Sequence, residues 1–136
     1  MKPWIASAAA VIVGFAVPAF ASVAANAVMH ATGIFPPVPE VMSNSLFAVA
    51  AAYRAIFTVA GGYVTARLAP SRPMRHVWIL AGIGFAAGLS SLTVYFNGGA
   101  EVGPAWYAIS IPVEAIPCVW LGGRLAAGRR ASVRVS

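Results

Sequence analysis

The chain has 136 residues, enough for one domain; 60% are hydrophobic, 9% are charged, and the mean hydropathy is +0.83. Soluble domains carry about 25% charged residues, so helices of this composition would present apolar surface on every side, which only lipid accepts. The net charge of +6 comes from nine cations and three acids. Nearly all the cations flank apolar runs instead of lining one face, which argues against nucleic acid as a partner.

A helix that spans a bilayer needs about 20 apolar residues, and four stretches meet this need. They are residues 4–29, 46–68, 77–96 and 105–121. The sequence therefore predicts an all-α fold, in which residues 1–136 form one polytopic membrane domain of four transmembrane helices.

The first stretch has two interpretations. Lys2, the apolar run after it and the Ala19-Phe20-Ala21 segment are typical of a signal peptide with a cleavage site. The run continues to Met29, however, and is longer than the apolar region of most signal peptides. We favour a retained transmembrane helix; cleavage would leave three helices in the same orientation.

The fourth stretch is the shortest and contains Pro112 and Pro117. Each proline removes a helix hydrogen bond and adds a steric clash, so we expect a bend. A short basic tail, residues 122–136, follows this stretch.

The connections between the stretches differ in charge. Residues 69–76 are basic, as are the two ends of the chain, whereas residues 30–45 and 97–104 contain no Lys or Arg. The positive-inside rule therefore predicts that both termini lie in the cytoplasm.

Similar segments recur along the chain and suggest two parallel helical-hairpin repeats. Residues 4–16 resemble residues 78–90, and Gly61-Gly62 resembles Gly122-Gly123 in a similar context. Parallel repeats are related by an axis along the membrane normal. The alternative is chance, since small apolar residues recur in any membrane helix.

Glycines within the apolar stretches indicate close helix packing. Gly84 and Gly88 form a Gly-x-x-x-Gly pair, and Gly61 and Gly62 are adjacent. Small residues let helix backbones approach closely in a bilayer. We expect them to pack within the bundle; the alternative is a homo-oligomer interface on the third helix.

Two charged residues lie deep within apolar stretches, Arg54 in the second and Glu114 in the fourth. A charge alone in hydrocarbon costs at least a few kcal/mol, so we expect these two to pair or to share a polar cavity. Tyr53, Ser110 and Pro112 are close in sequence and complete the candidate site. It is either a structural ion pair or a site for an ion or a small ligand.

Other features argue against an enzyme. His30 and His76 are expected on opposite sides of the membrane, so the sequence predicts no metal site and no haem. No Ser/His/Asp set and no phosphate-binding loop is present. We expect neither catalysis nor a cofactor.

The expected partners follow from the cations and the glycines. The arginines that flank the apolar runs are suited to anionic lipid head groups, although topology alone accounts for them. A second copy of the chain or another membrane protein is a further expected partner. The arginines concerned are Arg67, Arg72, Arg75, Arg124, Arg129 and Arg130.

The segment "YRAIFTVAGGYVTARLAPSRPMRH" (53–76), together with "PCVWLGGRLA" near the end of the chain, resembles small bacterial four-helix membrane proteins. This resemblance implies a bacterial inner membrane and no particular activity. Two functions then remain: a non-catalytic accessory membrane protein, or a small transporter or channel with a polar cavity around Arg54 and Glu114.

Overall fold

The computed structural model describes residues 2–37, 42–97 and 104–135, and these form four α-helices without a strand. They are α1 (Pro3–Ala31), α2 (Asn44–Leu68), α3 (Pro73–Phe96) and α4 (Ala105–Val135). All four are long and apolar enough to cross a membrane. The predicted all-α bundle of four membrane-capable helices is confirmed. Glu40 and Glu101, the acids in the connections 30–45 and 97–104, lie outside the described residues.

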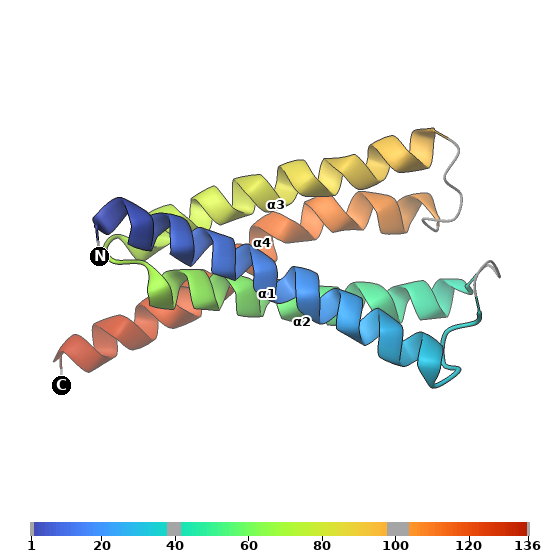
Figure 1. Cartoon of the computed structure of the whole chain (residues 1–136), viewed down its shortest axis with the longest axis horizontal. Coiled ribbons are helices and arrows are strands. Elements are labelled where there is room, and N and C mark those ends of the chain that lie inside the picture. Colours follow the sequence, from blue (N-terminus) through green and yellow to red (C-terminus); the bar gives the residue numbers. More distant parts are fainter. Residues whose placement is uncertain (1, 38–41, 98–103, 136) are drawn as a thin grey trace.

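The helices are arranged as two hairpins side by side. Both termini and the α2–α3 connection lie at one end of the bundle, here called the termini end, and the other two connections mark the far end (Figure 1). The most extensive packing joins α2 to α4, while α1 packs on α2 and α3 packs on α4. Because α2 and α4 both run from the far end toward the termini end, they are parallel neighbours.

Helix α4 is longer than predicted. We expected it to end at residue 121 and to be followed by a tail, but it continues to Val135. Gly122 and Gly123 do not end it because both are buried against other helices. Pro112 and Pro117 lie inside it, and Figure 1 shows α4 changing direction near its middle. Its 31 residues span about 46 Å, more than the hydrocarbon core of a bilayer.

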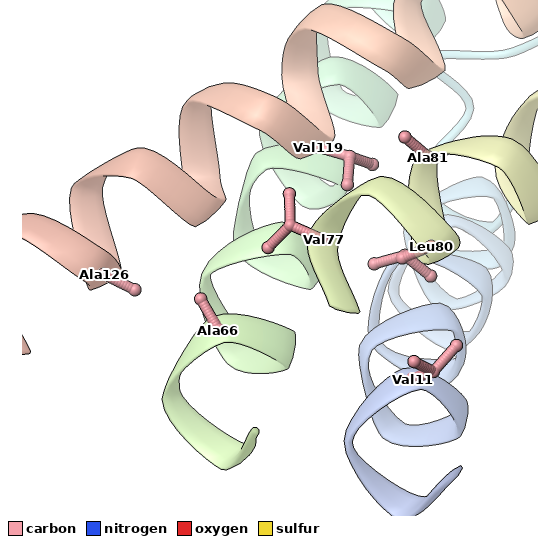
Figure 2. Close-up of a cluster of buried hydrophobic side chains, with 7 residues drawn as sticks. All are labelled: Val11, Ala66, Val77, Leu80, Ala81, Val119 and Ala126. Carbon is pink, nitrogen blue, oxygen red and sulfur yellow. The ribbon is translucent and has the colours of Figure 1, made fainter. Parts of the chain in front are cut away.

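A core of small apolar side chains joins all four helices near the termini end (Figure 2). Val11 comes from α1, and the other helices contribute alanines, valines and one leucine. The side chains are small because the helix backbones lie close together. The core cluster consists of Val11, Ala66, Val77, Leu80, Ala81, Val119 and Ala126.

Two glycines allow α2 and α4 to touch through their backbones. A β-carbon on Gly62 would overlap the carbonyl oxygen of Val119, and a β-carbon on Gly122 would overlap that of Val59. The contact is thus reciprocal. Gly62 of α2 lies against Val119, three residues before Gly122, and Gly122 of α4 lies against Val59, three residues before Gly62. No larger residue fits either position without separating the helices.

The reciprocal contact defines a two-fold relation between α2 and α4, in which each residue corresponds to the one 60 positions later. Ala66 and Ala126 agree with this register, since both have an exposed fraction of 0%. In this register Arg54 of α2 and Glu114 of α4 are equivalent positions. The sequence repeat pairs Gly14 of α1 with Gly88 of α3. Gly14 packs on Gly61 of α2, but Gly88 packs on Pro112 of α4, which is not the position equivalent to Gly61. The relation therefore does not extend to α1 and α3.

Arg130 joins α4 to the end of α2. Its Nη1 donates hydrogen bonds to the carbonyl oxygens of Ala66 (2.8 Å) and Ala69 (3.0 Å). The last carbonyls of a helix have no partner within the helix, and a cation there also interacts favourably with the helix dipole.

We predict that Gly62→Ala and Gly122→Ala each lower the free energy of unfolding by about 2 kcal/mol or more, because the added methyl group meets backbone. Thermal unfolding of the detergent-solubilised protein measures this. Gly82→Ala and Gly128→Ala are matched controls, since no atom lies within 4 Å of a β-carbon there. Equal stability of all four variants would contradict the backbone contact.

We also predict that Arg130→Ala destabilises the protein by about 1–3 kcal/mol, since two helix-end carbonyls lose their charged donor. Arg67→Ala is the control, because Arg67 lies exposed in the last turn of α2. A loss of the same size in both variants, measured by thermal unfolding, would show that general charge and not the cap is responsible.

Candidate functional site

A cavity of about 440 Å³ lies among the four helices and is partly open to the surroundings. The described residues of its walls are mainly apolar, with a few hydroxyl groups, one amide and two charged side chains. The residues that line the cavity include Phe15, Pro18, Ser22, Val23, Asn26, Arg54, Thr58, Leu80, Ser90, Ser91, Ile111, Glu114 and Val119.

The cavity extends from the middle of the bundle toward the far end. At its inner limit it reaches Leu80 and Val119, which belong to the core cluster. At the other limit it reaches Asn26 and Ser90, each within the last two turns of its helix. Figure 1 shows α3 and α4 diverging from α1 and α2 toward the far end. The core cluster therefore closes the cavity on the side of the termini.

Arg54 and Glu114 both border this cavity, from α2 and α4 respectively. Both side chains are half-buried, and they are close enough to interact electrostatically. No ion pair joins them within the described residues, and the buried Nε of Arg54 has no hydrogen-bond partner. In this structure the two charges share a cavity, which is one of the two arrangements expected from the sequence, and they do not form the direct pair.

The neighbouring candidates have other contacts. The Tyr53 hydroxyl donates to Oδ1 of Asn26 and so joins α2 to α1 beside the cavity. Ser110 Oγ donates to the carbonyl of Tyr107 in its own helix at 2.7 Å. Pro112 is buried against α3, where a β-carbon on Gly88 would lie 2.6 Å from its Cα. None of these three residues borders the cavity.

Most of the polar residues in the cavity wall were not predicted from the sequence. Ser22 and Asn26 on α1, Thr58 on α2, and Ser90 and Ser91 on α3 all border the cavity. One of these hydroxyl groups already has a partner within the protein, since Ser91 Oγ donates a hydrogen bond to the carbonyl oxygen of Ala108 at 3.2 Å. Ser22 and Asn26 lie four residues apart, and this spacing on one helix face was the available signal.

The glycines expected to pack do lie at helix contacts inside the bundle. Gly61 meets Gly14 and Pro18 of α1, and Gly62 meets α4. On α3, a β-carbon on Gly84 would lie 3.4 Å from that of Ala115, and Gly88 meets Pro112. Gly84 and Gly88 therefore both face α4 of the same chain, which leaves them unavailable to a second copy in this arrangement.

The basic residues at the termini end fall into two groups. Five of the six expected to contact anionic lipid are exposed, whereas Arg130 is half-buried and caps α2. Arg129 and Arg124 also lie near aromatic rings, at 5.9 Å from the centroid of Tyr63 and 5.8 Å from that of Trp120. The exposed residues are Arg67, Arg72, Arg75, Arg124 and Arg129.

The two histidines lie at opposite ends of the bundle. His30 Nδ1 is 3.1 Å from the carbonyl oxygen of Pro36, and His76 Nδ1 is 3.2 Å from that of Arg72. Among the residues with described positions, no three His, Cys, Asp or Glu side chains come together as a metal site would require.

Comparison with protein-family models, with curated proteins and with solved structures gives no match to this chain. The resemblance to small bacterial four-helix membrane proteins therefore stays an expectation, and the function has to be argued from the cavity.

We predict that water reaches the cavity from the far end. Cys118, the one cysteine of the chain, is first replaced by alanine. In that background, Ser90→Cys should react with a membrane-impermeant maleimide about tenfold faster than Ile56→Cys, because the thiolate that reacts needs water. Ile56 is the control: it is 67% exposed but lies in the second apolar stretch and away from the cavity. Equal rates in intact cells or proteoliposomes would argue against a water-accessible cavity.

Proposed function

We propose that the protein is a small integral membrane transporter that binds a solute in the cavity around Arg54 and Glu114. The observation that carries this proposal is that two charges in the middle of the bundle border one cavity without pairing. Ionisable side chains inside a membrane bundle are costly, and they commonly mark substrate or ion pathways.

The shape of the cavity supports the same proposal. Binding sites are usually concave and mainly apolar, with a few polar groups that orient the ligand. This cavity has that character and a volume of about 440 Å³. It is closed toward the termini end by Leu80, Val119 and the rest of the core cluster. Passage of a solute across the membrane would need this cluster to separate.

The direction of transport depends on the orientation in the membrane. We propose a bacterial inner-membrane location with both termini in the cytoplasm, on the basis of the basic termini end. The far end of the cavity would then face the outside. Anionic lipids beside the exposed arginines would hold this orientation. The proposal involves no catalysis and no cofactor.

The other function is that of a non-catalytic accessory protein, in which Arg54 and Glu114 form a structural pair. Breaking a buried pair on one side costs about 3–5 kcal/mol, because a charge is left without its partner. Thermal unfolding of Arg54→Glu, Glu114→Arg and the double exchange distinguishes the two functions. Lower stability of each single variant, restored in the double exchange, would favour the accessory protein. A solute site predicts that the double exchange does not restore stability.

Blocking the cavity tests transport directly. Ala87→Phe places a ring in the cavity, and we predict that it reduces solute uptake into proteoliposomes about tenfold or more. Ala86→Phe is the matched control, since this neighbouring residue is exposed and does not border the cavity. The labelled solutes are phenylalanine, 3-phenylpropionate and phenethylamine. Uptake of none above that of empty liposomes would contradict transport of such solutes.

A further inference from the structure

We propose that the cavity takes a zwitterion with an apolar body, whose anionic group binds Arg54 and whose ammonium group binds Glu114. This inference rests on the proposed function, since it identifies the solute class for the same cavity. It is carried by the placement of one cation and one anion on neighbouring helices around one mainly apolar space.

The balance of charge points to a ligand that carries both signs. Among the residues with described positions, Arg54 and Glu114 are the charged ones that border the cavity, so this part of its lining is neutral overall. An anion that paired with Arg54 alone would leave Glu114 without a partner and would be repelled by it. A cation that paired with Glu114 alone would meet the same difficulty at Arg54. A zwitterion satisfies both side chains at once, and a desolvated charge left unpaired is strongly unfavourable.

The geometry places the two charges at one level. In the two-fold relation between α2 and α4, Arg54 and Glu114 are equivalent positions. The contact between the Phe47 and Tyr107 rings, 5.0 Å between centroids, follows the same register toward the far end. The two side chains therefore approach the cavity from adjacent parallel helices, and a ligand that lies across them can contact both.

Arg54 has one donor that no acceptor satisfies among the described residues. Its Nε is buried without a partner, and a buried donor left unsatisfied costs free energy that a bound acceptor would recover. A carboxylate or phosphate can accept from Nε together with a terminal nitrogen of the guanidinium group. Arg54 is thus suited to the anionic group of the ligand.

The walls fit an apolar body. Phe15, Pro18 and Val23 border one side from α1, while Leu80 and Ile111 do so from α3 and α4. The volume of about 440 Å³ is more than a single ion requires. A hydrophobic amino acid or a related zwitterion would place its side chain against these walls.

The same charges occur on the head group of a zwitterionic phospholipid, so two sources share this chemistry. Arg54 lies ten residues and Glu114 nine residues from the far ends of their helices, or about 14 Å deep at 1.5 Å per residue. Lipid head groups lie at the membrane surface, so the depth favours a free solute.

Three probes with one apolar body test the charge requirement in the purified full-length protein. Phenylalanine carries both charges, 3-phenylpropionate only the anionic one, and phenethylamine only the cationic one. Calorimetric titration in detergent should show phenylalanine binding at least about tenfold more tightly than either of the others. A single-charge probe that binds as tightly as phenylalanine would overturn the proposal, and so would the absence of binding by phenylalanine.

Two variants assign the groups. Arg54→Gln should remove the preference for phenylalanine over phenethylamine, and Glu114→Gln should remove its preference over 3-phenylpropionate. Ser110→Ala is the control, because Ser110 lies on α4 near Glu114 but bonds only to its own helix. Unchanged preferences in both charge variants, with each variant folded by thermal unfolding, would show that these residues do not contact the ligand.

Two further measurements distinguish failure of the zwitterion proposal from failure of the proposed transport. Phosphatidylethanolamine in mixed micelles should not displace phenylalanine. Displacement by phosphatidylethanolamine but not by phosphatidylglycerol, the control lipid, would assign the site to the lipid head group and overturn the free solute. If the protein takes up a single-charge probe and Ala87→Phe blocks this uptake, the proposal of a zwitterionic ligand is overturned, whereas the proposed transport through the cavity is supported. Tight, selective binding of phenylalanine without any uptake would support the zwitterion site and contradict transport.

Discussion

The backbone contact between α2 and α4 fixes the positions of the other elements. Gly62 and Gly122 carry no side chain, and each lies against the carbonyl region of a valine in the opposite helix. In a bilayer, lipid is as apolar as the helices, so close packing and not the hydrophobic effect holds helices together. Two parallel helices that touch at this depth must keep one register. The outer helices α1 and α3 then pack on the pair from the sides.

The cavity follows from where that contact lies. Arg54 and Glu114 each precede the glycine of their own helix by eight residues, about 12 Å nearer the far end. At the crossing and toward the termini, Val77, Leu80 and Val119 fill the space between the helices. Toward the far end the hairpins diverge (Figure 1), and side chains from all four helices line the cavity on that side of the core cluster. The same crossing thus closes one side and places both charges at one level on the open side.

Particular residues show how far the sequence led. The apolar runs predicted four helices, and the cost of a charge in hydrocarbon singled out Arg54 and Glu114. The predicted end of the fourth helix at residue 121 was wrong, because α4 continues to Val135 and the glycines that follow residue 121, Gly122 and Gly123, serve helix contacts inside it. The hydroxyl and amide groups of Ser22, Asn26, Thr58 and Ser90 were missed. Small polar residues are common in membrane helices, and only their convergence on one space distinguishes these.

By itself, the sequence determined that the chain has four helices long and apolar enough for a bilayer and that two charges inside them need partners, because both conclusions depend on the transfer of side chains into lipid, a property of each residue. Only the tertiary structure decided whether those charges pair or share a cavity. That choice depends on the relative register of α2 and α4, which the backbone contact at Gly62 and Gly122 sets to within one residue. A shift of one position turns a helical side chain by about 100°, which would take Arg54 or Glu114 away from the cavity.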